Sequence, residues 1–453
     1  MINFLLKKLS YDLSSNAGLA FIGKYFQILN MTAFVDKLFP VRSGTSNSDI
    51  LKCFLGLLTL GKNDFECIEN FRGDDFFKRA LGLFHIPSCS TLRQRLDAYA
   101  KDWFELIPEL NHKLLSSRIA GKLIDFGVLP CGYTPIDCDT FAMDNSRTKK
   151  ESVGRTYAGV DGYCPFAAYL GRFGYCLELA LRPGTQHSAF ETHFNLERIL
   201  PMAVSLVMTP LLLRADSGFC SLKLMQLITA FAKTLQREIA FIIKWNPRSA
   251  PVEAIAAKKV ADTNTQWKIL REGKRECMWT EKLDLANVGT ETNPVSRVYR
   301  LTERTIDKHG VVLLVPNYEI EGWTHTLPER FSPTEIIELY GDHATHEQFH
   351  SEFKTDMNFE RLPSGKFDTN YLICQLAGLA MNMLRILGQN TLIGANSPVR
   401  HTAERRRIKT VLQEIMYKAG RMIKTGRRWV LGLGENDKGY QVFERYYKEL
   451  NTA

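Results

Sequence analysis

The 453-residue sequence contains ten cysteines but no C-x-x-C pair. Isolated cysteines argue against a zinc ribbon and against a disulfide framework, and they are typical of reduced thiols in the cytosol. The longest apolar run, residues 199–213, contains two prolines and is too short to cross a bilayer. Residues 1–13 have no small-residue cleavage site after an apolar core. We therefore expect a soluble, cytoplasmic protein without a membrane partner.

The net charge of +9 is concentrated near the C-terminus. Residues 400–428 contain ten Arg or Lys against Glu404 and Glu414, a local charge of +8, so the remaining residues are close to neutral. A localised basic segment favours a polyanionic partner such as nucleic acid, although a solvated basic helix is a common alternative. The length also permits two or three domains.

Residues 1–130 have the apolar spacing of helices and are predicted to form a helical N-terminal DNA-binding domain. Within them, residues 86–100 predict a short amphipathic helix, with Ser88 or Ser90 as its N-cap. Arg93 and Arg95 on this helix are candidates for DNA contacts. A capped surface helix whose arginines only face solvent is the alternative.

The pattern changes to strands after residue 130. Three neighbouring strands, a helix, a strand, a helix and a strand are predicted over 131–246, which describes a mixed α/β sheet with helices on its faces. Residues 247–331 are predicted to be a β-rich insertion domain. Residues 332–395 return to helix and complete the core, and residues 396–453 are predicted to be a basic helical region.

Two strands carry carboxylates that a buried strand would not need. Asp137 and Asp139 lie two apart on the first strand, so their side chains share one face. Asp216 ends the fourth strand, which is a natural neighbour of the first. Close carboxylates repel unless a proton or a metal intervenes, and an oxygen-only cluster suits Mg²⁺ or Mn²⁺. Alternatively, Asp216 caps the turn at Gly218 or the helix that begins near Ser221.

A third carboxylate is expected from the helix over 343–357, which offers Glu347, Glu352 and Asp356. Glu347 shares a helix face with Lys354, seven residues later, whereas Glu352 is rotated away from Glu347. The spacing therefore favours Glu347 as a metal ligand and Lys354 as a phosphate contact.

Tyr340, His343, Glu347 and Lys354 have the spacing of a Tyr-x2-Arg-x3-Glu-x6-Lys signature, with His in place of Arg. In this respect the sequence resembles the DDE transposases of bacterial insertion sequences. The segments "DCDT" and "LLLRADSGF" are similar to the surroundings of the first and second acidic residues of that family. Together with "DGYCPFAAYLG" and "LRPGTQHSA", they resemble the insertion-sequence family numbered 1380, which is related to piggyBac. The resemblance covers roughly residues 45–430.

The resemblance implies a ribonuclease-H-like catalytic fold and a cut-and-paste transposase that cleaves at terminal inverted repeats and transfers strands to target DNA. Asp139, Asp216 and Glu347 would hold two Mg²⁺ (or Mn²⁺) ions per active site. Asp139 is preferred to Asp137 because Thr140 follows it, as in the family. The resemblance also implies a homodimer on DNA, associated with the bacterial nucleoid, and no small-molecule substrate.

The same resemblance suggests further DNA contacts. The insertion would contact the transposon end, with Trp279 or Trp267 stacking on a base, although a core role is more usual for Trp in a small β domain. Lys244 at a strand end would touch phosphate or only face solvent. The full set of candidate DNA contacts is Lys354, His343, Tyr340, Arg93, Arg95, Lys244, Trp279, Arg405, Arg406, Arg407, Arg427 and Arg428.

Two other functions share most of these features. One is a transposase-derived DNA-binding protein that no longer cleaves, and the other is a metal-dependent, ribonuclease-H-like nuclease that is not mobile. In a protein that binds DNA without cleaving it, three carboxylates facing phosphate would only weaken binding. This argues against the first alternative.

Overall fold

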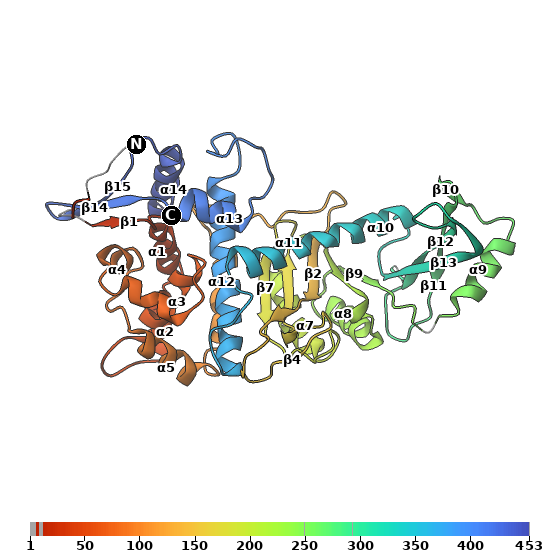
Figure 1. The fold of residues 1–453 in the computed structure, drawn as a ribbon, viewed down its shortest axis with the longest axis horizontal. Coiled ribbons are helices and arrows are strands. Elements are labelled where there is room, and N and C mark those ends of the chain that lie inside the picture. Colours follow the sequence, from red (N-terminus) through yellow and green to blue (C-terminus); the bar gives the residue numbers. More distant parts are fainter. Residues whose placement is uncertain (1–5, 9–11, 249, 292, 453) are drawn as a thin grey trace.

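A computed structural model describes residues 6–8, 12–248, 250–291 and 293–452. Residues 1–5 and 9–11 of the predicted N-terminal domain lie outside the described residues. The molecule is elongated, with a helical region at one end, a central sheet, and the insertion at the other end (Figure 1). Both termini lie at the helical end.

The N-terminal region is helical, as predicted. Its helix α5 begins after Ser88, whose hydroxyl accepts a hydrogen bond from the amide of Thr91, so Ser88 is the N-cap. The elements of this region are β1 (Leu13–Ser14), α1 (Leu19–Ile28), α2 (Met31–Leu38), α3 (Asn47–Leu58), η1 (Phe65–Phe71), α4 (Asp75–Ala80), α5 (Cys89–Tyr99) and α6 (Leu106–Ser116).

The central sheet has the predicted order of elements. Its strands and helices are β2 (Thr134–Thr140), β6 (Phe166–Leu170), β7 (Tyr175–Ala180), α7 (Thr192–Leu206), β8 (Leu211–Ala215), η2 (Ser217–Phe219), α8 (Leu222–Thr234) and β9 (Ile239–Lys244). In space the strands are ordered β7-β6-β2-β8-β9. Strand β2 runs parallel to β8 and antiparallel to β6, so the first and fourth predicted strands are neighbours.

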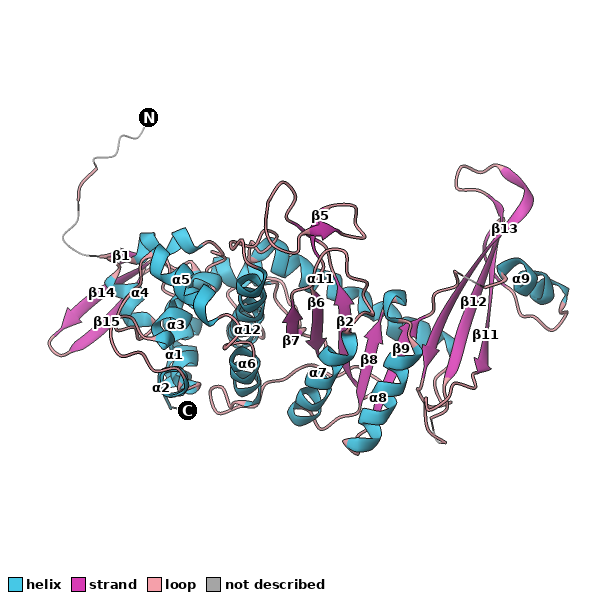
Figure 2. Cartoon of the chain, turned by 90° about the horizontal axis from the view of Figure 1, so that it is seen from below, coloured by secondary structure: helices cyan, strands magenta, loops and turns pink. Residues whose placement is uncertain are grey.

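Helices cover both faces of this sheet. Helices α7 and α8 lie on one face (Figure 2). On the opposite face, α10 (Pro333–Gly341), η3 (Asp342–Ala344), α11 (Thr345–Ser351) and the π-helical η4 (Glu352–Asp356) form one rod across the strands (Figure 1). A small sheet of β3 (Met143–Asp144), β4 (Gly154–Arg155) and β5 (Asp161–Tyr163) follows β2.

The insertion extends the central sheet. It comprises α9 (Val252–Ala261), β10 (Lys268–Arg271), β11 (Lys274–Lys282), β12 (Ser296–Ile306) and β13 (Val312–His325). The four strands β10 to β13 make this insertion β-rich. The last residues of β13 pair antiparallel with β9, which gives one nine-stranded sheet. The insertion is therefore joined to the core through strand pairing.

The C-terminal region differs from its prediction as a helical segment. It contains α13 (Ile408–Val411), η5 (Leu412–Met416), a hairpin of β14 (Gly420–Thr425) and β15 (Arg428–Leu433), and α14 (Tyr440–Thr452). The two-residue loop between the paired residues Thr425 and Arg428 has Gly426 at φ 58°, which favours the hairpin. Strand β14 also pairs with β1, and the hydroxyls of Tyr25 and Tyr446 are 2.8 Å apart. The C-terminal region therefore packs on the N-terminal helices.

Helix α12 (Phe367–Thr391) is the central buried element of the chain. It is the one described helix whose length and composition would suit a membrane span, but 94% of its most apolar window is buried within the protein, which is typical of a core helix. It packs against β7, the edge strand of the sheet, and against α6. It thus joins the helical end to the sheet.

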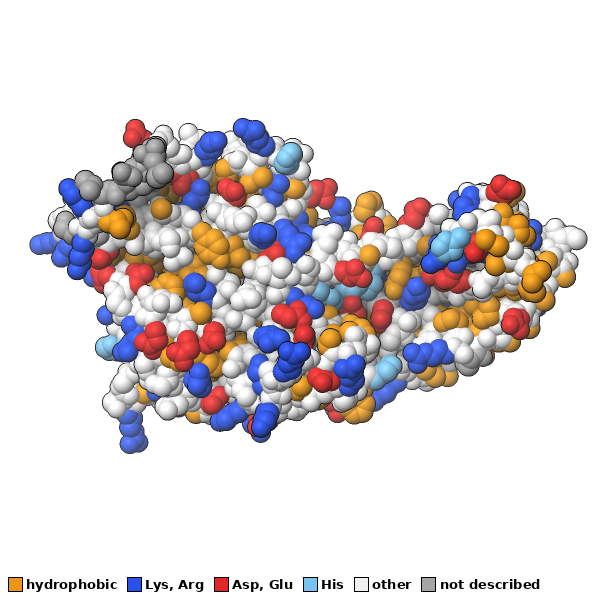
Figure 3. Space-filling model, viewed as in Figure 1, with side chains coloured by type: hydrophobic (Ala, Val, Ile, Leu, Met, Phe, Trp, Pro, Cys, Tyr) orange, Lys and Arg blue, Asp and Glu red, His pale blue; other side chains and the backbone are white. Residues whose placement is uncertain are grey.

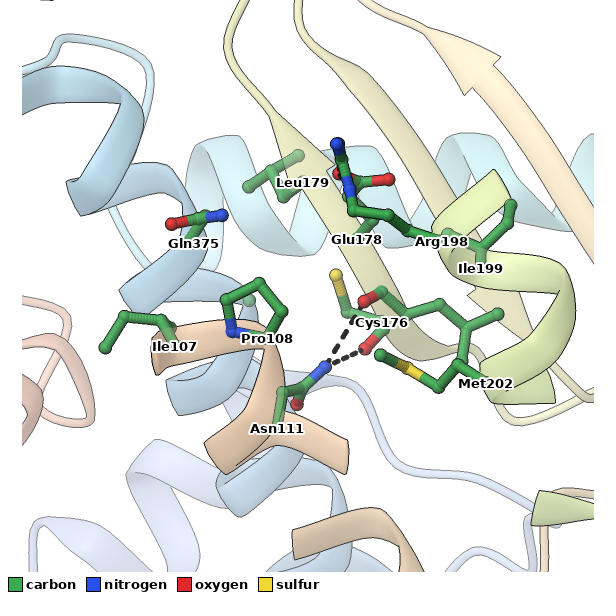
Figure 4. Close-up of a pocket in the computed structure, with 12 residues that line it drawn as sticks. Ile107, Pro108, Asn111, Cys176, Glu178, Leu179, Arg198, Ile199, Met202 and Gln375 are labelled. Atoms are coloured by element: carbon green, nitrogen blue, oxygen red, sulfur yellow. Dashed lines mark hydrogen bonds and ion pairs between the residues drawn. The ribbon is translucent and has the colours of Figure 1, made fainter. Parts of the chain in front are cut away.

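Buried amides of α6 and α12 satisfy the edge of β7. The Asn382 side chain accepts from the Cys176 amide at 2.8 Å and donates to the Cys176 carbonyl at 2.7 Å and to Asn111 Oδ1 at 2.8 Å. Asn111 donates to the same carbonyl at 2.9 Å, beside a cavity of about 30 Å³ (Figure 4). An edge strand with satisfied backbone groups cannot recruit another strand there.

We expect Asn382→Leu to lower the free energy of unfolding by about 1–3 kcal/mol, because it leaves the Cys176 amide and Asn111 without a buried partner. Thermal and denaturant unfolding would measure the change. Asn390→Leu on the same helix is the control, since the Asn390 side chain donates to the Ile386 carbonyl of its own helix. Equal destabilisation by both substitutions would contradict the role given to Asn382.

Candidate active site

A cleft of about 410 Å³ lies where the carboxyl ends of β2 and β8 meet the α10–α11 rod. Asp139, Asp216 and Glu347 all line it. Histidine and acidic side chains gather near the middle of this face of the molecule (Figure 3). The structure therefore brings together the three carboxylates that the sequence singled out.

Strand pairing positions the first two carboxylates. Cys138 of β2 is opposite Ala215, the last residue of β8. Asp139 directly follows Cys138, and Asp216 directly follows Ala215. Asp216 Oδ1 accepts from the Gly218 amide at 2.9 Å, so the capping role considered for Asp216 is also present. Burial, followed by the nearby charge of Asp139, raises the pKa of Asp216. The two carboxylates are thus close enough to repel each other.

The three candidates for the third carboxylate have different surroundings. Glu347 on α11 is exposed to the cleft. Glu352 is fully buried and pairs with Arg385 and Arg405. Asp356 accepts from Arg407 at 2.7 Å. Of these three, only Glu347 faces the cleft, because the other two carboxylates neutralise arginines.

Asp137 is engaged in a buried ion pair. The Arg214 guanidinium donates to its two carboxylate oxygens at 2.7 and 2.8 Å, and His343 Nδ1 lies 2.9 Å from Oδ1. Burial opposes ionisation, but the charge of Arg214 and the contact with His343 hold the pKa of Asp137 well below its usual range. Arg214 also donates to the carbonyl of Leu339 at 2.6 Å. Asp137 therefore links β2, β8 and the α10–α11 rod.

Two histidines near Asp139 were not singled out as site residues from the sequence. His346 Nε2 lies 2.5 Å from Asp139 Oδ2, and His350 Nδ1 lies 3.9 Å from the same oxygen. Burial raises the pKa of Asp139, but the hydrogen bond with His346, the charges of His350 and His346 and the Thr140 amide together outweigh it, and the pKa is lowered. His343, His346 and His350 are three and four residues apart, which places them on one helix face. Their spacing in the sequence could therefore have indicated that the three histidines lie together.

A family model described as "Transposase DDE domain group 1" matches residues 9–453. The chain belongs to this family of DDE transposases. The resemblance stated from the sequence is therefore confirmed, and with it the prediction of an enzyme that carries out DNA transposition. No curated protein sequence matches the chain. A solved structure, a piggyBac transposase synaptic complex with hairpin DNA, is similar at 9% identity and a TM-score of 0.40, over 97% of this chain and 82% of that one.

The signature residues of the transposase lie at or near the cleft. Tyr340 lines the cleft, and its ring packs against Trp323 and His343. His343 is only 2% exposed and contacts Asp137, so in this structure it does not present the surface cation expected at the Arg position. Lys354 Nζ donates to the Ala142 carbonyl at 2.8 Å and lies 3.0 Å from Glu360. Its predicted contact with phosphate would compete with these two partners.

The other candidate DNA contacts of the transposase are distant from the cleft or have partners within the protein. Arg93 is half-exposed and lies 3.6 Å from Glu66, and Arg95 donates to Asn47 at 2.7 Å. Lys244 pairs with Glu321 at 3.0 Å. The structure does not test DNA binding by these three residues, so their DNA contacts stay predictions.

Trp279 is held between side chains of the insertion. Its ring stacks on Tyr299 at 5.0 Å, and Lys259 lies over it at 4.4 Å. Trp267 is covered in the same way by Arg275, at 4.2 Å. Both Trp rings are therefore packed within the insertion, which is the core role that the sequence analysis gave as the alternative to base stacking. Stacking on a base would first require Lys259 or Arg275 to move away from the ring.

The basic C-terminal residues form two groups. Arg405 and Arg407 pair with Glu352 and Asp356, and Arg406 donates to the carbonyls of Leu392 and His401. Arg427 and Arg428 lie exposed at the turn of the β14–β15 hairpin. Within the described part of the chain, neither Arg427 nor Arg428 makes an ion pair.

We expect Glu352→Gln to lower stability far more than Glu347→Gln. Loss of the Glu352 charge leaves Arg385, which is 1% exposed, without its buried counter-ion, and should cost about 3–5 kcal/mol of unfolding free energy. Glu347→Gln changes an exposed side chain and should shift stability by less than about 0.5 kcal/mol. Thermal unfolding of both variants tests this. A stable Glu352→Gln variant would contradict the structural role assigned to Glu352.

Proposed function

We propose that this transposase carries out metal-dependent cut-and-paste transposition, with Asp139, Asp216 and Glu347 as its catalytic carboxylates. The observation that carries the proposal is their convergence on one cleft from three separate segments of the chain. The proposed substrates are the terminal inverted repeats of the element and a target DNA. We also propose that it acts in the cytoplasm, associated with the nucleoid.

The proposed catalytic fold is ribonuclease-H-like. Three consecutive antiparallel strands, followed by two parallel strands with a helix before each, support this assignment. In that arrangement, the carboxyl ends of the parallel strands β8 and β9 and of β2 meet at one edge, where ligands of open α/β sheets bind.

The donor set fits divalent metal ions. Asp139 and Asp216 are neighbouring carboxylates, burial and the charge of Asp139 raise the pKa of Asp216, and the cleft has room for water and phosphate. Asp139, Asp216 and Glu347 would hold Mg²⁺ or Mn²⁺, two ions per site. When bound, such ions activate water or a 3′-hydroxyl and stabilise the leaving oxygen in phosphoryl transfer.

The chain itself supplies positioning. The amide of Gly218 fixes one oxygen of Asp216, and the amide of Thr140 fixes Asp139 Oδ1 at 2.7 Å. The Asp137–Arg214 pair holds both strands in register beneath them. Because metal ligation requires carboxylates placed within about 0.5 Å, such support is expected below a catalytic site.

A homodimer on DNA is part of the proposal. Each chain presents one such cleft in its described part, and cut-and-paste transposition acts on two element ends. One chain per end is the simplest arrangement, since a C2 dimer is the most common symmetric assembly.

We expect Mg²⁺-dependent cleavage of a labelled DNA that carries the flanking ends of the gene. Asp216→Asn and Glu347→Gln should each reduce the cleavage rate by at least about a hundredfold, because each removes an anionic oxygen that charge stabilisation requires. Binding of the same DNA, measured by fluorescence anisotropy, should be retained.

Two outcomes would favour the alternatives. Binding without cleavage by the wild type, in Mg²⁺ and in Mn²⁺, would indicate a transposase-derived DNA-binding protein. Cleavage without preference for the element boundary would indicate a non-mobile nuclease. Glu329→Gln is the matched control, since Glu329 is an exposed carboxylate that pairs with Lys282 and does not line the cleft.

We expect Arg427→Ala/Arg428→Ala to weaken DNA binding and to reduce the slope of log affinity against log salt by about 0.9 per lost phosphate contact. The exposed hairpin turn carries these cations at the end of the molecule where Lys and Arg side chains gather (Figure 3). Arg405→Ala is the comparison, since Arg405 pairs with Glu352 inside the protein. An unchanged salt slope in the double variant would exclude the hairpin from the interface.

A further inference from the structure

The surroundings of His346 match those of a histidine that binds metal. Its Nδ1 contacts the backbone carbonyl oxygen of His343, and its Nε2 lies 2.5 Å from Asp139 Oδ2. A carbonyl oxygen can only accept, so Nδ1 is the donor of that contact. At that distance Nε2 and the carboxylate oxygen are joined by a hydrogen bond, and a metal ion bound by both groups would replace the proton between them. Donation from the other ring nitrogen to a carbonyl is also how metal-ligating histidines are oriented.

A second imidazole completes the cluster. One ring nitrogen of His350, one of His346 and one carboxylate oxygen of Asp139 lie within 4.8 Å of one another. His350 is 6% exposed, and its Nε2 makes no hydrogen bond within the described part of the protein. Its ring packs against Phe141 and Tyr169, so it is held in place beside Asp139.

We propose that Asp139, His346 and His350 form a binding site for a transition-metal dication, such as Mn²⁺, Co²⁺ or Zn²⁺. Two imidazoles and one carboxylate suit these ions, whereas Mg²⁺ prefers oxygen ligands and retains several waters. Three protein ligands leave coordination positions open toward the cleft. The site shares Asp139 with the proposed catalytic triad, but it uses two nitrogen ligands that the triad does not contain.

The shared ligand has a functional consequence. An ion held by the two histidines also uses Asp139 as a ligand. An ion that binds nitrogen strongly, such as Zn²⁺, should therefore compete with the ions that the three carboxylates hold. This consequence rests on the proposed function. The binding site itself does not, because metal binding can be measured without DNA.

Titration of the purified full-length protein with Co²⁺, followed by visible absorption, tests the site. The wild type should develop the d–d bands of nitrogen-coordinated cobalt. Zn²⁺ should abolish these bands, whereas an excess of Mg²⁺ should leave them. His346→Ala and His350→Ala should each weaken Co²⁺ binding by about tenfold or more, at least the effect of losing an outer-shell partner. His112→Ala is the matched control, since the His112 ring on α6 bonds to Ser205 and lies outside the Asp139, His346 and His350 cluster.

Absence of the bands in the wild type, or unchanged binding in either histidine variant, would overturn the proposal and leave His346 paired with Asp139 through a proton. His346→Gln, checked by thermal unfolding, serves where His346→Ala does not fold. Asp216→Asn separates the two hypotheses. It should retain the cobalt bands even though cleavage is lost, so failure of the catalytic assignment does not imply failure of the metal site.

Discussion

The buried ion pair between Asp137 and Arg214 is the interaction on which the candidate active site depends. Asp137 lies on β2, Arg214 on β8, and the pair reaches the α10–α11 rod through the Leu339 carbonyl and through His343. Asp139 and Asp216 each follow a member of this cluster by two residues, and Glu347 follows His343 by four. Each proposed catalytic carboxylate is therefore one strand repeat or one helical turn from a fixed, buried neighbour.

Such a pair is costly in isolation, because two charges lose their hydration, and a well-packed apolar replacement is often as stable. Here both carboxylate oxygens accept from the guanidinium, and the guanidinium also satisfies a helix carbonyl. The planar guanidinium of Arg214 therefore fixes the distance between the two strands and the helix. Apolar contacts would define this distance less specifically. The arrangement favours precision in the position of the carboxylates over stability alone.

Local patterns predicted most of the fold and part of the site. Strand alternation and turn residues predicted the strand, helix and strand order from β2 to β9. Because Asp137 and Asp139 are two residues apart on one strand, they were also predicted to share a face, the one toward α11. This spacing could not show which of the two is free to bind metal, because that depends on Arg214, 77 positions away in sequence from Asp137. The pairing of β13 with β9 is non-local in the same way. The β14–β15 hairpin was wrongly predicted as helix, because a high density of basic residues does not distinguish a charged helix from a charged hairpin, whereas the left-handed turn at Gly426 does.

The basic C-terminal segment illustrates why charge that is concentrated in sequence need not be concentrated in space. Arg405 and Arg407 neutralise Glu352 and Asp356 of η4, which continues the helix that carries Glu347. Lys418 similarly pairs with Asp437 at 2.7 Å. These cations act within the protein. Arg405 and Arg407 anchor the C-terminal end of the helix that carries Glu347, while the Asp137 cluster anchors its start. Glu347 thus lies on a helix that is fixed at both ends by ion pairs, with its own carboxylate left free to face the cleft.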